Sequence, residues 1–206
     1  MRSVVIGKYG DPTRHRGPDT VRGRLVPSRS RSSTAPTAPE ENPVNASAQP
    51  VLVRAGSAET LQDGATSLIT LLADSDGTQG ALTANRATLR KGSPGAPAHF
   101  HTRATEMFFV LGGSLRVLLG DRIVTLGTGD FVTVPPRLPH AFAPAPGEEA
   151  DVLVAFTPGM DRFDYYRLLE RVYRGEATVE DIKASSERYD NHYYASPLWQ
   201  AELADD

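Results

Sequence analysis

Three of the five histidines in this chain lie close in sequence to one glutamate. His99 and His101 are two residues apart, and strand side chains with that spacing point to the same face. Glu106 follows a short loop, and His140 comes about one hairpin later. Imidazole and carboxylate groups suit Fe, Ni, Mn, Co, Zn or Cu, and this set does not choose among them. The sequence therefore predicts that His99, His101, Glu106 and His140 bind one divalent transition metal.

This ligand set also indicates what kind of metal site to expect. Three nitrogens and one oxygen leave one position open on a five-coordinate metal, or two on a six-coordinate metal. Structural metal sites are closed by protein ligands, whereas catalytic sites keep an open position for water or substrate. The predicted site is therefore of the catalytic kind.

Short runs rich in β-branched and apolar residues occupy the middle of the chain, with glycine-containing turns between them. The runs are 51–54, 67–73, 81–90, 106–112, 114–120, 122–127, 130–135 and 151–156. Gly112-Gly113 and Gly120-Asp121 are typical of tight hairpin turns. Many short strands at regular spacing indicate a sandwich or a barrel. We expect residues 49–159 to form one all-β barrel.

After this region the hydrophobic period changes to that of an amphipathic helix. The apolar positions that carry the period are Tyr165, Leu168, Leu169 and Val172, spaced i, i+3, i+4 and i+7. Gly175 is well placed to end this helix. Residues 160–206 are therefore predicted to form a helical extension of the barrel.

A second helix is predicted to begin at Thr178. Thr178 followed by Asp181 resembles a capping box, with Asp in place of the usual Glu or Gln, and the helix should run to about Arg188. The last residues are aromatic without a regular period, and we expect them to pack on the barrel or on a second subunit. The aromatic side chains of this region could alternatively form a lid, and they are Tyr165, Tyr166, Tyr189, Tyr193, Tyr194 and Trp199.

The composition is that of an ordinary soluble protein, and it bears on which partners and which chemistry to expect. A chain of 206 residues can form one domain with a sizeable core. Its net charge of -3 is no argument for a nucleic-acid partner. There is no cysteine, which excludes disulfides, zinc–thiolate sites and a thiol nucleophile. No apolar run approaches the length of a bilayer span. We expect a cytoplasmic protein without a membrane partner.

The N-terminal segment differs from the rest in charge and hydrophobicity. Residues 1–48 are basic, rich in Ser, Pro and Arg, and poor in large apolar side chains. Such a stretch cannot bury enough surface to offset the entropy of ordering it. We expect a disordered tail, or an extension upstream of a natural start near Val44.

Two motifs resemble those of the cupin superfamily. The first motif is matched by His99-x-His101, four residues, Glu106, six residues and Gly113, with its leading glycine displaced to 92 or 95. The second motif is matched by Gly129, five residues, Pro135 and then His140. The resemblance covers about residues 65–157 and implies a cupin jelly-roll barrel.

The second motif departs from the family pattern at two positions. Arg137 stands where glycine is usual, and Pro144 stands where asparagine is expected. These departures concern the local turn and do not remove a metal ligand.

Within the superfamily, the chain resembles small quercetin 2,3-dioxygenase-like monocupins. The last strand runs into Phe156-Thr157-Pro158-Gly159 and then a helix rich in aromatic residues, as in that group. The resemblance implies a metal-dependent dioxygenase acting on an aromatic or enol-containing small molecule, with Glu106 as both ligand and general base. A Lewis-acid isomerase, lyase or polyketide cyclase and a non-catalytic small-molecule binder remain open. The resemblance also implies a homodimer.

Strand alternation predicts which side chains surround the metal. Counting from Glu106, Phe108 and Val110 should share its inward face, and counting from His140, Phe142 should do the same. These residues predict a largely apolar substrate pocket. Equally, they could simply fill the core of a small barrel.

Overall fold

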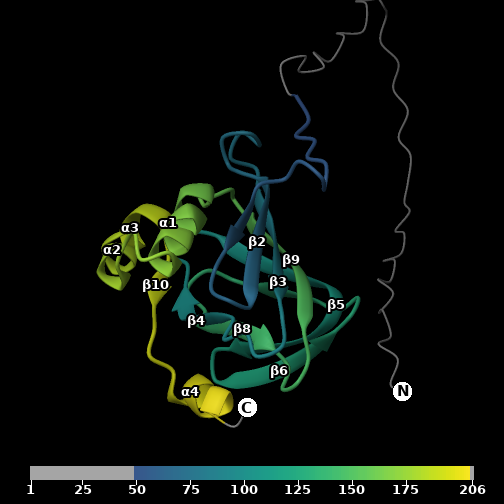
Figure 1. Cartoon of the computed structure of the whole chain (residues 1–206), viewed down its shortest axis with the longest axis vertical. Coiled ribbons are helices and arrows are strands. Elements are labelled where there is room, and N and C mark those ends of the chain that lie inside the picture. Colours follow the sequence, from purple (N-terminus) through teal and green to yellow (C-terminus); the bar gives the residue numbers. More distant parts are fainter. Residues whose placement is uncertain (1–48, 205–206) are drawn as a thin grey trace, which may run out of the picture. The chain divides into compact units, whose positions relative to one another are not determined.

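The computed structural model describes residues 49–204 (Figure 1). The strands are β1 (Thr60–Gln62), β2 (Ser67–Ala73), β3 (Thr83–Leu89), β4 (Ala96–Phe100), β5 (Thr105–Leu119), β6 (Arg122–Gly127), β7 (Phe131–Val134), β8 (His140–Pro144), β9 (Ala150–Thr157) and β10 (His192–Tyr193). The helices are α1 (Phe163–Tyr173), α2 (Val179–Ala184), α3 (Ser186–Tyr189) and α4 (Pro197–Ala204). The predicted disordered tail, residues 1–48, lies outside the described residues.

The strands form a curled antiparallel sheet in the order β1-β2-β3-β9-β5-β8-β4-β10, with β6 and β7 also paired to β5. The first half of β5 pairs with β7 and β9, and its second half pairs with β6 and β8. One long strand thus belongs to both faces of the barrel. The predicted all-β jelly-roll class with a helical C-terminal part is confirmed.

The middle of β5 corrects the sequence-based prediction of a hairpin turn. The chain bends at Gly112-Gly113 but continues as one strand, with a register shift against β9. Gly113 has a φ of +74°, and a Cβ there would lie 2.0 Å from the Glu149 backbone oxygen. Only glycine permits both this backbone conformation and the close approach. Because the bend passes β5 from one face to the other, it helps to close the barrel.

Apolar side chains fill the space between the two faces. This core includes Phe108, Val110, Leu115, Val117, Val152 and Phe156, all fully buried. The run at 51–54, predicted as a strand, has no regular structure. Its Val51 and Leu52 are exposed, so the run buries no side chain in the sheet.

The end of α1 and the start of α2 lie where the sequence predicted them. Helix α1 ends one residue before Arg174, and Gly175 adopts a φ of +74°. Thr178 and Asp181 form the predicted capping box at the start of α2. The predicted second helix is interrupted at Ser185, and α3 is a separate short helix.

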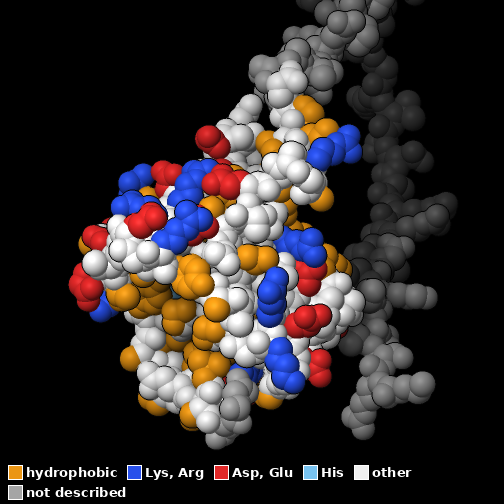
Figure 2. Space-filling model, viewed as in Figure 1, with side chains coloured by type: hydrophobic (Ala, Val, Ile, Leu, Met, Phe, Trp, Pro, Cys, Tyr) orange, Lys and Arg blue, Asp and Glu red, His pale blue; other side chains and the backbone are white. Residues whose placement is uncertain are grey.

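The helices cover different parts of the barrel. Helices α1 to α3 pack their aromatic and aliphatic side chains on β1 and β2, through Tyr165, Tyr166, Ile182 and Tyr189. Helix α4 lies apart from them and packs Trp199 against β4, β5 and β8 (Figure 1). Charged side chains of both signs gather over α1 to α3, whereas hydrophobic side chains gather near β10 and β4 (Figure 2). No helix within residues 49–204 is long and apolar enough to cross a bilayer.

Helix α4 was missed by the helical periodicity. It begins with Ser196-Pro197, and the Ser196 hydroxyl accepts a hydrogen bond from the Trp199 backbone N–H at 3.2 Å. Serine before proline at the first helical position is a recognised helix start. This local signal could have been found in the sequence.

Candidate metal centre and cavity

The four predicted ligands converge inside the barrel from three different strands. His99 lies near the end of β4, His101 immediately follows that strand, Glu106 is at the start of β5 and His140 begins β8. His99 is directly paired with His140 across β4 and β8. All four side chains are buried, and their ligand atoms lie within 4.8 Å of one another. The barrel therefore brings the four predicted ligands together.

The glutamate is at the centre of this group. Its Oε2 atom lies 2.6 Å from Nε2 of His140, 3.1 Å from Nε2 of His101 and 4.0 Å from Nε2 of His99. The three imidazoles thus present the same ring nitrogen to one carboxylate oxygen. A single ion in their midst could contact all four groups.

Backbone carbonyls fix the tautomer of each imidazole. Nδ1 of His99 lies 2.8 Å from the Pro97 oxygen, that of His101 lies 2.5 Å from the Asp190 oxygen, and that of His140 lies 2.9 Å from the Leu138 oxygen. A carbonyl can only accept, so each Nδ1 carries the proton and donates. In a neutral ring this leaves the Nε2 lone pair facing inward.

The Nε2 lone pairs of the three histidines and the Glu106 carboxylate oxygen therefore face one another at the centre of the cluster. Neutral Nε2 atoms and a carboxylate oxygen are all acceptors, and they require protons or a cation between them. Three imidazole nitrogens and one carboxylate oxygen are a suitable donor set for a divalent transition metal. The residues present thus fit such a metal, without selecting which one.

The pKa values of the ligands follow from burial and from this crowding. Burial and the neighbouring His140 and His101 lower the pKa of His99 well below its usual value. Burial opposes ionisation of Glu106, but His140 and His101 outweigh it and hold its pKa well below the usual range. For His140, burial is outweighed by the Glu106 carboxylate, which raises its pKa. Glu106 is therefore an anion and His99 a neutral ligand at neutral pH.

Asp190, between α3 and β10, supports the site from a distant part of the chain. Its carboxylate accepts hydrogen bonds from the Thr102 backbone N–H at 2.9 Å, the Thr102 hydroxyl at 2.6 Å and the Arg103 backbone N–H at 3.0 Å. Its backbone oxygen holds Nδ1 of His101. Asp190 thus fixes both His101 and the loop that leads to Glu106. Sequence reasoning missed it, because nothing local links it to the histidines.

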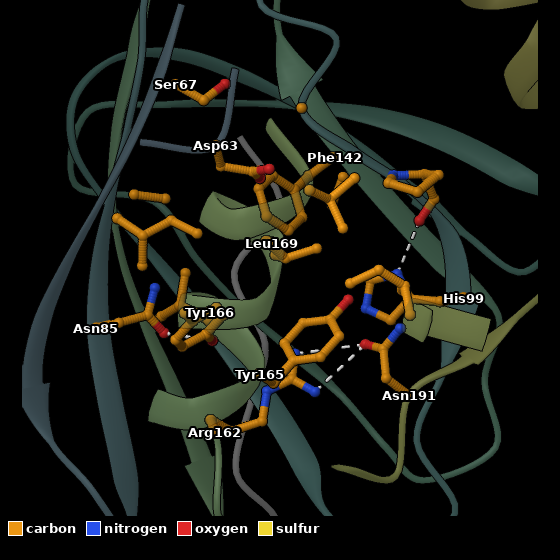
Figure 3. A pocket seen from close by; sticks show the side chains of 18 of the residues that line it. Asp63, Ser67, Asn85, His99, Phe142, Arg162, Tyr165, Tyr166, Leu169 and Asn191 are labelled. Atoms are coloured by element: carbon orange, nitrogen blue, oxygen red, sulfur yellow. Dashed lines mark hydrogen bonds between the residues drawn. The ribbon is translucent and has the colours of Figure 1, made fainter. Parts of the chain in front are cut away.

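A cavity of about 510 Å³ adjoins the candidate metal centre (Figure 3). Two of the ligands, His99 and Glu106, line its buried end, together with Arg162. Exposed side chains of Pro97, Val179 and Lys183 line its other end. Most of the remaining lining is apolar and comes from strands β2, β3, β8 and β9 and helices α1 and α2, with residues such as Leu68, Ile69, Ala87, Leu89, Phe142, Val154, Leu169, Val172 and Ile182. A small organic molecule could therefore lie beside the ligand cluster.

The structure separates the three residues predicted to line the pocket. Phe142 lines the cavity, whereas Phe108 and Val110 do not border it. Both belong to the fully buried core of the barrel, where the Phe108 ring packs 5.1 Å from that of Phe142. Alternation placed them correctly on the inward face, but packing between strands fills that depth of the barrel. For these two residues the alternative of core filling describes the structure.

Other side chains of the cavity come from the C-terminal part. Tyr165, Tyr166 and Tyr193 line it, while Tyr189 and Trp199 pack in apolar clusters away from it. The Tyr165 and Tyr193 hydroxyls are 2.9 Å apart, which joins α1 to β10 over the cavity. Arg162, immediately before α1, was not predicted at all.

A protein-family model matches the part of the chain that contains the two sequence motifs. The cupin domain model matches residues 85–156, which span β3 to β9 and contain all four candidate ligands. This part of the chain is a cupin domain by its match to the family model. No protein of curated function matches the chain.

Several solved structures match part of the chain at low sequence identity. An RmlC-like cupin from Shewanella frigidimarina is 20% identical with a TM-score of 0.46, over 57% of this chain and 96% of the other. KdgF from a Halomonas species is 19% identical with a TM-score of 0.44, over 50% and 90%. Hydroxypropylphosphonic acid epoxidase from S. wedmorenis is 21% identical with a TM-score of 0.44, over 52% and 58%.

Proposed function

We propose that this cupin is a metal-dependent enzyme and, specifically, a quercetinase-like dioxygenase that acts on an aromatic or enol-containing small molecule. One observation carries the proposal: three inward-facing imidazole nitrogens surround the Glu106 carboxylate at the buried end of an apolar cavity. His99, His101, Glu106 and His140 would hold the metal. Bound there, a transition metal supplies a Lewis acid and, for some metals, a centre for oxygen chemistry.

Glu106 is the residue best placed to move a proton. It lines the cavity and is held ionised by the histidines around it, so it can accept a proton from a substrate hydroxyl. His101 and His140 do not border the cavity, and their role is to hold the ion and orient Glu106. The surrounding apolar side chains would exclude water and position an aromatic or enol body.

Metal content is the first test of this proposal. Protein purified without chelators should contain close to one transition metal per chain, measured by plasma emission spectroscopy. If the protein carries no metal and takes up none of the six candidate ions on titration, the dioxygenase and the Lewis-acid enzyme are both contradicted. A non-catalytic small-molecule binder would then be favoured.

Oxygen consumption then separates the two enzyme classes. A dioxygenase should consume O2 with flavonol or catechol-type substrates, recorded with an oxygen electrode. A Lewis-acid isomerase, lyase or cyclase should instead transform its substrate equally well without oxygen. The same metal site and cavity would serve that second function, because polarising a substrate oxygen needs only the ion and a nearby base.

Cytoplasmic location belongs to the proposal as well. Fractionation of cells that express the tagged full chain should place it in the cytoplasmic fraction. Recovery in a membrane fraction would contradict this part of the proposal.

A further inference from the structure

Arg162 is a buried cation at the inner end of the cavity. It is 3% exposed and lines the same cavity as His99 and Glu106. Figure 3 shows it next to Tyr165 and Asn191. Its guanidinium carbon lies 4.4 Å from the centre of the Tyr165 ring, 4.9 Å from that of Phe156 and 5.3 Å from that of Tyr166. Aromatic rings around a guanidinium stabilise its charge and hold its plane in one orientation.

The hydrogen bonds of this guanidinium are few, long and made to neutral groups. Nη1 donates to the Tyr189 carbonyl at 3.3 Å, and Nη1 and Nη2 share the side-chain oxygen of Asn191 at 3.3 and 3.4 Å. Nε is buried without a hydrogen-bond partner among the described residues. A guanidinium has five N–H donors, so part of its donor capacity is unused.

Other arginines of this chain show what such a group normally binds. Arg86 holds Asp151 through Nε and Nη2, and Arg167 holds Glu59 through the same two atoms. Both pairs are on the surface, where an ion pair is worth little. Arg162 is far more buried, and its backbone N–H donates to the Asp74 carboxylate at 3.2 Å. Its guanidinium, however, forms no ion pair within 4 Å among residues 49–204. In Arg86 and Arg167 the Nε and Nη2 atoms bind a carboxylate. In Arg162 the same two atoms bind no carboxylate within residues 49–204.

No carboxylate of the cavity forms an ion pair with Arg162 within 4 Å among the described residues. Glu106 also lines the cavity and its charge helps to raise the pKa of Arg162, but its carboxylate makes its close contacts with the histidines. The other carboxyl group of the lining is Asp63, whose pKa is raised by burial and which forms no ion pair with Arg162. Lys183 adds a further positive charge at the exposed end. With a divalent ion bound, the fixed charges of the inner end would sum to a positive value.

We propose that Arg162 is the anion-binding residue of this cavity and that the substrate carries a carboxylate on an apolar, aromatic or enol body. The carboxylate would pair with the guanidinium, while the body would lie between the apolar walls and present its reactive oxygen toward His99 and Glu106. A cavity of about 510 Å³ is large enough for a body of one or two rings. This inference deepens the proposed function and rests on it for the reaction, though not for the binding of the anion.

Matched pairs of anionic and neutral probes test the inference on the unmodified full chain. Benzoate, salicylate and cinnamate would each be compared with the amide of the same size by isothermal titration calorimetry. At least one carboxylate should bind about tenfold or more tightly than its amide, because a hydrogen bond to a charged group is worth more than a neutral one. If all three carboxylates bind no better than their amides, the inference is wrong.

Variants then assign the preference to one residue. Arg162→Gln should abolish the preference for the carboxylate, Arg162→Lys should keep part of it, and the exposed control Arg86→Gln should leave it unchanged. A preference that survives in Arg162→Gln would overturn the assignment. If Arg162→Gln does not fold, a preference left undiminished in Arg162→Lys would overturn it instead, because lysine lacks the planar fork.

Metal-free protein separates this inference from the proposed function. Each titration would be repeated after chelation and dialysis. A carboxylate preference that depends on Arg162 in the metal-free protein supports the inference even if the chain takes up no metal. If metal binds well and carboxylates show no preference, the proposed function stands and the inference fails.

Discussion

At the residue scale, the inward lone pairs of three imidazoles define the site. Pro97, Leu138 and Asp190 offer backbone oxygens, and these oxygens decide which ring nitrogen faces the centre of the cluster. Substituting a ligand and substituting the base should therefore have different effects, since Glu106 is the only carboxylate of the four groups and lines the cavity.

His101→Ala should lose most of the bound metal, because it removes one of three neutral nitrogens. Glu106→Gln should reduce turnover more strongly than metal content, since the amide keeps an oxygen ligand but cannot accept a proton. Metal per chain and turnover would be measured for both, with the exposed variant Arg167→Gln as the control. Equal metal loss in the two site variants would contradict the assignment of Glu106 as base.

Metal affinity should rise with pH. The Glu106 carboxylate raises the pKa of His140, so that ring keeps its proton to higher pH in the metal-free protein than a free imidazole would. A metal needs the Nε2 lone pair and must displace that proton. Affinity should fall by up to about tenfold per pH unit below the pKa of His140 and level off above it. Competition with a chelator of known pH dependence between pH 6 and 8 measures this, and a constant affinity would contradict it.

At the element scale, the segment between α3 and β10 supports the metal ligands. Asp190 is 1% exposed and adopts a left-handed φ of 49°. Burial opposes its ionisation, but hydrogen bonds from Thr102 and Arg103 lower its pKa. The segment from α1 to β10 therefore does not only pack on the barrel. Through Asp190 it also positions His101.

Asp190→Asn should weaken both the fold and the metal site. The amide nitrogen cannot accept the hydrogen bond from Arg103 or Thr102, and an unsatisfied buried donor costs about 1–3 kcal/mol. Loss of such a support for a metal ligand lowers metal affinity by about 10- to 100-fold. Urea unfolding and metal titration would be compared with Glu187→Gln, whose side chain is 94% exposed. A variant with native stability and native metal affinity would contradict the role of Asp190.

The bend in β5 provides a second prediction at this scale. Gly113 and Gly129 both have positive φ, but only at Gly113 would a Cβ collide with backbone, 2.0 Å from the Glu149 oxygen. Gly129→Ala should cost about 1–2 kcal/mol of the free energy of unfolding, from backbone strain alone. Gly113→Ala should cost clearly more, because the two strands must also move apart. Denaturant unfolding of both variants measures the difference, and similar costs would show that the close approach is unimportant.

At the scale of the whole molecule, the outer face of the barrel carries an exposed apolar strip. Phe109 on β5 and Phe131 on β7 are directly paired and are 39% and 57% exposed, and Leu111 follows at 42%. Such side chains are more typical of an interface than of a solvated sheet face. We propose that two copies of this chain pair through the strip, which would make the protein a homodimer.

Light scattering after size exclusion would test this assembly. The full chain should have the mass of two copies, and Phe131→Glu should shift it toward one copy by placing a charge in the interface. Thr60→Glu, on the distant strand β1, is the control and should keep the native mass. A monomeric native protein, or a dimer unaffected by Phe131→Glu, would contradict the proposed interface.

Much of the fold could be predicted from local patterns. Alternation and glycine turns indicated six of the strands, β2, β3, β5, β6, β7 and β9. The period of Tyr165 to Val172 indicated α1, and Thr178 with Asp181 indicated the start of α2. The failures have physical causes. The run at 51–54 has strand composition but buries nothing, and Gly112-Gly113 bends a strand instead of ending it, because turn composition does not say which segment lies opposite.

The sequence by itself determined which four residues could bind a metal, since residue type and spacing fix which donors share a strand face. Only the tertiary structure decided what surrounds them. Asp190 reaches His101 from 89 residues away, and Arg162 meets the cavity only because α1 packs back on the sheet. Contacts between segments so far apart leave no local period, so the supporting carboxylate, the buried guanidinium and the cavity itself appear only in the folded chain.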